Sequence, residues 1–149
     1  MTDSDLTKST IAAILRRKVG ETSATRLFEN FPESVRRNML TEVKLDAQEQ
    51  PILASMRDEH RWVFLTTAGL YHFDRGKITH ITFNEIDSAE MELTRDQQQP
   101  VATKAAATDI RITLTSGKEH WLTVEPFKGM VGIANVLQYV MRRNKRRIS

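Results

Sequence analysis

The spacing of apolar residues changes period twice along this chain, and this change limits the fold more than any other feature of the sequence. Apolar side chains recur at helical spacing over the first 45 residues, and largely at every second position between residues 52 and 124. Helical spacing returns from Pro126 onward. A chain with this order is expected to fold as a mainly antiparallel sheet with helices at both ends.

The first 45 residues predict two or three short amphipathic helices. Apolar residues around Ile14 fall on one helical face, and Gly20 is placed to end that helix. A second helical stretch carries Leu27 and Phe28, and Pro32 interrupts it and opens a third. The apolar side chains of the third helix are expected on one side: Val35, Met39, Leu40 and Val43.

Seven strands are predicted in the middle of the chain, because short runs rich in β-branched and aromatic residues alternate with polar or glycine-containing breaks. They are expected at residues 52–56, 62–66, 70–73, 78–83, 86–93, 110–114 and 120–124. Turns at residues 74–77 and 116–118 predict two hairpins. Residues 95–108 are polar and alanine-rich without periodicity, which predicts a long loop.

The last helix is predicted to have an unusually wide apolar face. Its members are Phe127, Met130, Val131, Ile133, Ala134, Val136, Leu137, Val140 and Met141. An apolar arc this broad has to be covered on most sides. Together with the unassigned helices at the start of the chain, it motivates the hypothesis that the protein forms a homo-oligomer.

The order of strands, turns and final helix resembles the pleckstrin-homology-like (PH-like) superfold, in particular bacterial PH-like and GRAM-like domains. The resemblance covers residues 52–143 and is carried by three segments: LTTAGLYHFDRGK, the Phe83-Asn84-Glu85-Ile86-Asp87 entry to the fifth strand, and SGKEHWLTVEP before the helix. It implies an α+β, mainly β fold, a seven-stranded antiparallel barrel of two roughly orthogonal sheets with the C-terminal helix capping one end.

The resemblance also divides the chain into three parts. Residues 1–45 form a helical N-terminal extension outside it, residues 52–143 form the PH-like domain, and residues 144–149 form a basic tail. Whether the extension packs on the barrel or makes an interface of its own is left open by the sequence.

Several classes of chemistry are excluded by composition. The chain has no cysteine, so disulfides, thiolate metal sites and thiol nucleophiles are absent. There is no Gly-x-Ser-x-Gly elbow and no phosphate-binding glycine loop, because Ser116-Gly117-Lys118 reads as a hairpin turn. We therefore expect a binding module that is not an enzyme and uses no cofactor. A small enzyme or regulator with an unrecognised site is the alternative that we rank last. The start lacks the apolar run of a signal peptide, which favours the cytoplasm.

Positive charge is concentrated at the end of the chain. The formal net charge is +3, and residues 142–149 hold five basic groups, so the rest of the chain carries −2. Candidate contacts to a partner in this region are Arg142, Arg143, Lys145, Arg146 and Arg147. Such a cluster suits an anionic membrane surface or, as the alternative, a nucleic acid, although it lacks interleaved aromatic residues for base stacking.

PH-like domains that bind inositol phosphates use basic residues on the first two strands and the loop between them, which here offers Arg57 and Arg61. Asp58 and Glu59 lie between these arginines and oppose phosphate binding. The leading hypothesis is accordingly an adaptor that recognises a protein partner or a membrane surface, through a strand edge, the 95–108 loop or the N-terminal helices.

Two minor expectations concern histidine and tryptophan. If the strands on either side of the turn at residues 74–77 pair, His72 and His80 lie near each other and, with a carboxylate such as Asp74, offer a zinc site as the disfavoured alternative. The preferred interpretation is that these histidines line a half-exposed sheet and bind no metal. Trp62 and Trp121 are expected in the core.

Overall fold

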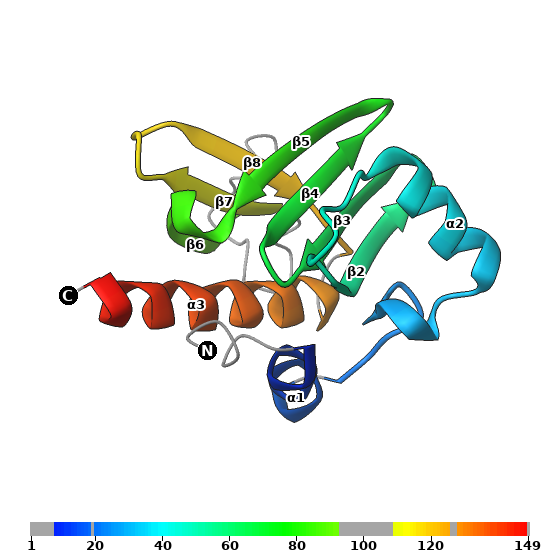
Figure 1. Cartoon of the computed structure of the whole chain (residues 1–149), viewed down its shortest axis with the longest axis horizontal. Coiled ribbons are helices and arrows are strands. Elements are labelled where there is room, and N and C mark those ends of the chain that lie inside the picture. The colour runs from blue at the N-terminus through cyan, green and yellow to red at the C-terminus, as the bar shows by residue number, and fades with distance from the viewer. Residues whose placement is uncertain (1–7, 19, 93–108, 126–127, 149) are drawn as a thin grey trace, which may run out of the picture.

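The computed structural model describes residues 8–18, 20–92, 109–125 and 128–148, and the loop predicted at residues 95–108 lies outside them. The described elements follow one another along the chain as shown in Figure 1. They are α1 (Lys8–Lys18), β1 (Thr25–Leu27), the 3-10 helix η2 (Phe28–Asn30), α2 (Glu33–Glu42), β2 (Pro51–Asp58), β3 (Arg61–Thr66), β4 (Gly69–Asp74), β5 (Lys77–Thr82), the 3-10 helix η3 (Phe83–Glu85), β6 (Ile86–Glu92), β7 (Asp109–Leu114), β8 (Glu119–Thr123) and α3 (Lys128–Ile148).

The described strands form two antiparallel sheets. Sheet A has five strands in the order β1-β2-β3-β4-β5, and sheet B has three in the order β6-β7-β8. The expected α+β, mainly β architecture with a C-terminal helix is confirmed. The closed seven-stranded barrel is not formed by the described residues, because η3 turns the chain from one sheet into the other and no ladder of hydrogen bonds joins the two sheets.

Strand β1, which is additional to the seven predicted strands, forms where a helix was predicted. The stretch carrying Leu27 and Phe28 was expected to be helical, but residues 25–27 pair with β2, with Leu27 opposite Leu53. Leu27 packs into the core between the helices and the sheets, whereas Phe28 packs on the opposite face of sheet A. Consecutive apolar side chains that enter two different cores suit an extended segment, since a strand sends neighbours to opposite faces.

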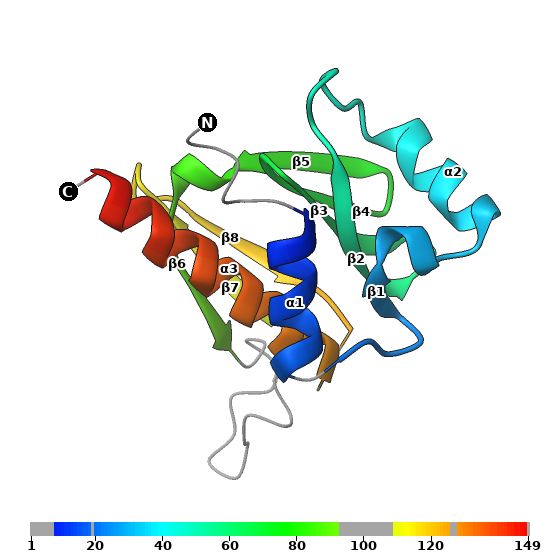
Figure 2. The ribbon, with the colours of Figure 1, turned by 60° about the horizontal axis from the view of Figure 1, so that its bottom comes forward.

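The inner core lies between the sheets and the helices α1 and α3. The inward side chains of both sheets, such as Val63, Leu65 and Ile112, pack with Ile133 and Leu137 of α3. Helix α1 crosses α3 on the outer side, as Figure 2 shows, and adds Ile11 and Leu15 to the same core. The described apolar side chains of the α3 arc, apart from the half-buried Val131, are therefore buried by the chain itself.

An outer core covers the other face of sheet A. It is formed by aromatic side chains of β3 and β4 with residues of η2, α2 and the segments around them: Phe28, Phe31, Met39, Val43, Trp62, Phe64 and Tyr71. Helix α2 follows Pro32, as predicted. Leu40 was expected on the buried side of α2 but is 42% exposed, because Val35, Met39 and Val43 are spaced by four residues and Leu40 lies a third of a turn away.

A buried hydroxyl network ties the N-terminal segment to the chain before α3. The Thr25 hydroxyl lies 2.7 Å from the Ser55 hydroxyl and donates a hydrogen bond of 2.6 Å to Glu125 Oε1. The Thr22 hydroxyl donates to the same oxygen. Residues 20–27 are thus fixed to sheet A and to the entry of α3 at once.

Candidate functional site

Helices α1 and α3 form a layer on one side of the molecule, and this layer carries a strongly unbalanced charge. The two helices contain ten of the 22 lysines and arginines of the chain and none of its 19 acidic residues. Their formal charge is +10, so the remainder of the chain, with twelve basic and nineteen acidic residues, carries −7. We call α1 and α3 the basic helix layer.

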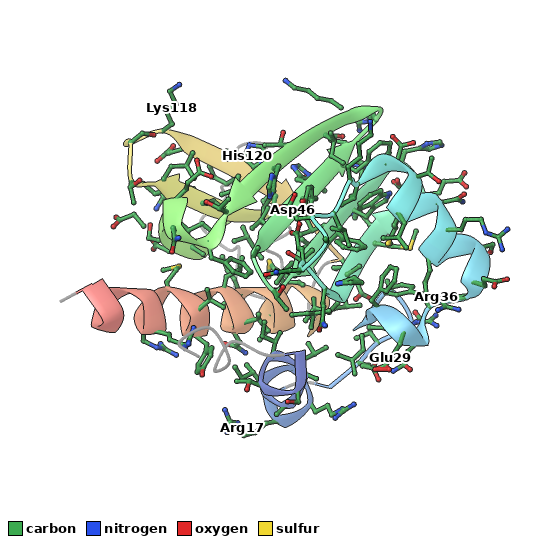
Figure 3. All side chains as sticks on the ribbon, viewed as in Figure 1. Arg17, Glu29, Arg36, Asp46, Lys118 and His120 are labelled. Atoms are coloured by element: carbon green, nitrogen blue, oxygen red, sulfur yellow. The ribbon has the colours of Figure 1, made fainter. Side chains whose placement is uncertain are left out.

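The described cations of this layer face solvent at two places. Arg16 and Arg17 are exposed at the end of α1, and Arg142 is exposed near the end of α3. Figure 3 places Arg17 on the helical side of the molecule, far from Lys118 and His120 in that view. The layer therefore presents guanidinium groups from segments that lie about 125 residues apart in the sequence.

The residues predicted for partner contacts at the chain end divide into three groups. Arg142 is exposed and belongs to the layer, whereas Arg143 is buried, with 7% of its surface exposed. The backbone of Lys145, Arg146 and Arg147 is helical, since α3 continues to Ile148, and their side chains lie outside the described residues. Residues 144–148 of the predicted basic tail thus form the last turns of α3.

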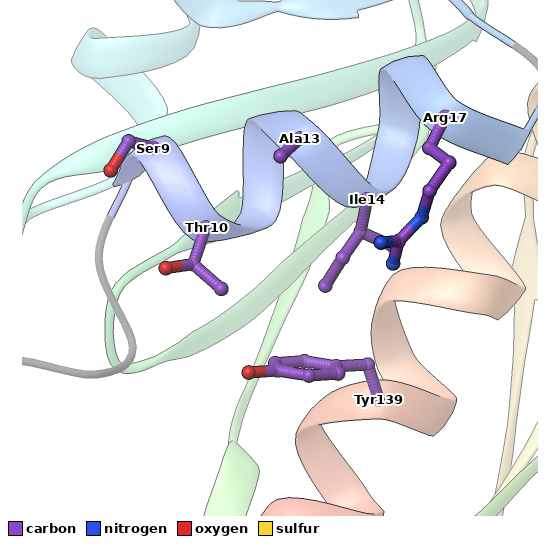
Figure 4. A pocket seen from close by; sticks show the side chains of 6 residues that line it. All are labelled: Ser9, Thr10, Ala13, Ile14, Arg17 and Tyr139. Atoms are coloured by element: carbon purple, nitrogen blue, oxygen red, sulfur yellow. The ribbon is translucent and has the colours of Figure 1, made fainter.

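An open groove of about 420 Å³ runs between α1 and α3. Figure 4 shows its lining, which consists of Ser9, Thr10, Ala13, Ile14, Arg17 and Tyr139. Arg17 lies at one end, the hydroxyls of Ser9 and Thr10 lie at the other, and the ring of Tyr139 lies between them. The groove combines a cation, hydroxyl groups and an apolar floor, which are groups that bind an anionic head attached to a carbon skeleton.

The arginines predicted for phosphate binding on β2 and β3 are occupied by protein groups. Arg61 donates hydrogen bonds of 3.0 and 2.6 Å to Asp58 Oδ2, and this bonding lowers the pKa of the Asp58 carboxyl below its usual value. Arg57 donates to the carbonyl oxygen of Val124 at 3.4 Å. The ion pair with Asp58 therefore opposes phosphate binding at Arg61, whereas Arg57 uses only one donor in its bond to Val124.

The predicted approach of His72 and His80 is wrong. His72 lies opposite Thr79 in the ladder between β4 and β5, so His72 and His80 point to opposite faces of sheet A. His80 stacks on Tyr71, with ring centroids 4.1 Å apart, and His72 instead meets His120 of β8, with Nδ1 and Nε2 separated by 2.9 Å. Within the described part of the chain, no three histidine or acidic side chains gather into a metal-binding group.

Burial changes the protonation of this histidine pair. Desolvation, followed by the neighbouring His120, lowers the pKa of His72 to about 4. Desolvation also lowers the pKa of His120. Both rings are therefore neutral at pH 7, and the pair joins sheet A to sheet B by a hydrogen bond.

Trp62 and Trp121 differ in their environments. Trp62 is buried in the outer core, as expected, and stacks on Phe73 with ring centroids 4.9 Å apart. Trp121 on β8 is only half-buried. Neither tryptophan lies in the groove between α1 and α3.

Comparison with models of known protein families gives no match, and no curated protein matches the sequence. Of the helices that are described, none has an apolar stretch long enough to cross a membrane. The function is therefore inferred from the geometry and charge of the described residues.

Sequence reasoning missed the basic helix layer, Arg17 and Tyr139. A signal was present, since residues 8–18 and 128–148 contain no Asp or Glu in a chain that has 19 of them. The two segments indicate a basic surface only when they lie side by side, and this arrangement depends on the fold.

Proposed function

We propose that this protein is a non-catalytic, PH-like docking module that attaches to an anionic membrane surface on the cytoplasmic side through the basic helix layer. The PH-like part of the proposal is supported by the order of elements: four antiparallel strands, β2 to β5, precede three more, β6 to β8, and then α3. That is the order which the resemblance implies, with α1, β1 and α2 added before it.

The separation of charge carries the proposal. The two helices carry +10, whereas the described residues outside them carry 10 − 16 = −6, so an anionic surface attracts the layer and repels the rest of the described molecule. Each lysine or arginine near an anionic bilayer contributes about 1 kcal/mol of binding free energy. Three exposed arginines alone, Arg16, Arg17 and Arg142, therefore contribute about 3 kcal/mol at low salt.

A membrane suits this layer better than a nucleic acid does. Single-stranded nucleic acids bind by stacking on exposed aromatic rings, and the one aromatic side chain of the described groove, Tyr139, is half-buried. The large hydrophobic side chains exposed among the described residues, Leu40 and Ile78, lie on α2 and β5 and not in the layer. For the described residues, the proposed attachment is thus electrostatic and reversible and involves no insertion of a large exposed apolar side chain.

The test is co-sedimentation of the full chain with phosphatidylserine-rich vesicles and with pure phosphatidylcholine vesicles. We expect binding only to the anionic vesicles, and a loss of about 100-fold in affinity when Arg16, Arg17 and Arg142 are all changed to Gln. The matched control changes Arg37, Arg75 and Lys118 to Gln, which removes the same charge from exposed positions outside the layer.

Two results would overturn the proposal. One is an equal loss of vesicle binding in both triple variants, because the position of the charges would then not matter. The other is tighter binding to duplex or single-stranded nucleic acid than to the anionic vesicles at the same salt concentration, which would make the layer a nucleic-acid surface.

The free edge of β5 supports a second candidate, in which the protein partner is another copy of this chain. Among the described residues β5 has one strand neighbour, β4, so its other side carries unpaired backbone groups. Ile78 on this strand is 39% exposed. Arg75 and Lys77 lie at one end of the edge and Glu85 lies beyond the other, so antiparallel pairing of two β5 strands places opposite charges together.

Sedimentation velocity at increasing protein concentration tests this candidate. The change Ile78→Lys is expected to weaken the dimer, whereas Leu40→Lys, at a similarly exposed leucine on α2, is expected to leave it unchanged. A wild-type chain that remains monomeric at high micromolar concentration, or equal effects of the two changes, would rule the pairing out.

A further inference from the structure

The groove between α1 and α3 lies inside the basic helix layer, where anions are concentrated by the surrounding charge. Its volume of about 420 Å³ falls within the range of about 300–1,000 Å³ that small-molecule sites occupy. No carboxylate belongs to its lining or to either helix that forms it. An anion that enters the groove therefore meets no acidic side chain from the two helices.

Arg17 supplies the cation of the groove. It is exposed, and it makes no hydrogen bond or ion pair with another described residue, in contrast to Arg61 and Arg57. Its side chain extends from α1 toward α3 (Figure 4). A planar guanidinium binds phosphate oxygens through two parallel hydrogen bonds.

The remainder of the groove separates apolar from polar contacts. Ala13, Ile14 and the ring of Tyr139 form the middle, and the hydroxyls of Ser9 and Thr10 lie at the end away from Arg17 (Figure 4). The middle suits a short carbon skeleton that extends from the phosphate on Arg17. The lining thus changes along the groove from the cation at Arg17, through apolar side chains, to hydroxyl groups.

We propose that this groove is a binding site for a phosphate ester, with the phosphate on Arg17 and the carbon skeleton on Tyr139 and Ile14. This inference rests on the proposed function, because the basic helix layer supplies the local concentration of phosphate. The phosphate ester belongs either to a lipid headgroup or to a soluble molecule.

The experiment titrates the ¹⁵N-labelled full chain with three probes and follows the backbone amide signals of α1 and α3. The probes are a soluble short-chain phosphatidylserine, glycerol 3-phosphate and, as the uncharged control, glycerol. We expect saturable shifts of the groove residues with the two phosphate esters and none with glycerol. Tighter binding of the lipid assigns the site to a headgroup, and equal binding assigns it to a soluble phosphate ester.

Neighbouring arginines give a matched pair of variants. Arg16→Gln and Arg17→Gln remove the same charge from exposed positions of α1, but only Arg17 lines the groove. We expect Arg17→Gln to weaken binding of the esters by at least about tenfold, as loss of a charge-assisted pair does, and Arg16→Gln by about twofold or less. Thr10→Val and Tyr139→Phe remove groove hydroxyls without a charge change, and the spectra report directly whether each variant is folded.

Two results would contradict a specific site: equal losses of ester affinity in Arg16→Gln and Arg17→Gln, or phosphate-induced shifts spread evenly over both helices. Either would mean that the helices attract phosphate only through their overall positive charge. Vesicle binding in the same samples separates the two proposals. If the vesicles bind but the soluble esters do not, the groove inference fails and the proposed function stands. If no anionic vesicle binds, the proposed function fails, whereas saturable ester binding that depends on Arg17 would still establish the site.

Discussion

His72 shows how one side chain can link the stability of the fold to pH. It is 4% exposed, it bonds to His120 at 2.9 Å, and burial lowers its pKa from 6.5 to about 4. Because the unfolded chain binds the proton more tightly than the folded one, this neutral histidine stabilises the fold fully above pH 6.5. That contribution is lost as the pH falls from 6.5 to 4.

We therefore predict that the free energy of unfolding falls by about 2 kcal/mol between pH 7 and pH 5, within a maximum of about 3 kcal/mol for the whole shift. Urea unfolding at a series of pH values measures it. His72→Gln, which cannot titrate, is expected to flatten the curve over this interval. A variant with the same slope as the wild type would show that another group is responsible.

Two glycines tolerate a methyl group differently because of what surrounds them. A Cβ at Gly69 would overlap the backbone carbonyl of Ile81 on the neighbouring strand β5, which has no room to move. A Cβ at Gly129 would overlap Glu125 Oε1 and Thr25 Oγ1, which bond to each other in the buried hydroxyl network, whereas alanine favours the helix by about 0.5–1 kcal/mol. Close approach, not turn geometry, requires glycine at both positions.

We predict that Gly69→Ala lowers the free energy of unfolding by about 2 kcal/mol or more and Gly129→Ala by less, because overpacking at Gly69 is against backbone and the helix preference of alanine offsets part of the loss at Gly129. Thermal and urea unfolding of the two variants test this order. Adding Glu125→Ala to Gly129→Ala is expected to recover part of the loss. The reverse order of the two single variants would contradict the prediction.

Among the elements, α1 differs most from the role that the sequence suggests. Residues 1–45 read as an extension, but Ile11 and Leu15 are fully buried in the same core as α3 and both sheets. The apolar arc of α3, which motivated the hypothesis of self-association, is covered by α1. The wide apolar face of α3 therefore no longer supports self-association, because its described side chains are buried within the same chain.

We predict that Leu15→Ala lowers the free energy of unfolding by about 2–5 kcal/mol, as expected for a fully buried leucine, with a single cooperative transition. Leu40→Ala, the same change at a leucine that is 42% exposed, is expected to cost less than about 1 kcal/mol. Urea unfolding followed by tryptophan fluorescence and by circular dichroism measures both. A separate early transition for Leu15→Ala would mean that α1 unfolds independently.

Strand positions were predictable because alternation of side chains is a local signal. The strands from β2 onward begin and end within two residues of the predicted ranges, and Gly76 and Gly117, both with positive φ, form the two expected hairpin turns. Strand β1 was not predictable, because three residues are too short for a period to emerge. Its position depends on pairing with β2, which is distant in sequence.

At the scale of the whole molecule, two features lay beyond sequence reasoning for the same reason. The outer core around Phe64 and the basic helix layer both bring together segments that are far apart in the chain. Arg57 and Arg61 were identified from the resemblance alone, and their hydrogen bonds to Val124 and Asp58 depend on the folded backbone. Composition revealed the excess of basic residues at the chain end, but the matching excess in α1 becomes meaningful only once the helices touch.

Charge separation also predicts the kinetics of attachment. Lowering the salt concentration from about 0.15 M to about 0.01 M lengthens the screening distance from about 8 Å to about 30 Å, so the association rate with anionic vesicles should rise at least about tenfold. The dissociation rate should change less, because contacts already made are only partly screened. Stopped-flow fluorescence resolves the two rates, and a salt effect confined to dissociation would contradict this.

The uneven charge of the molecule has a mechanical consequence. A molecule that carries +10 in α1 and α3 and 10 − 16 = −6 in the other described residues has a large dipole moment, and a negatively charged plane exerts a torque on it before the two touch. Brownian rotation is then biased during the approach, so that collisions with α1 and α3 foremost become more frequent than chance allows.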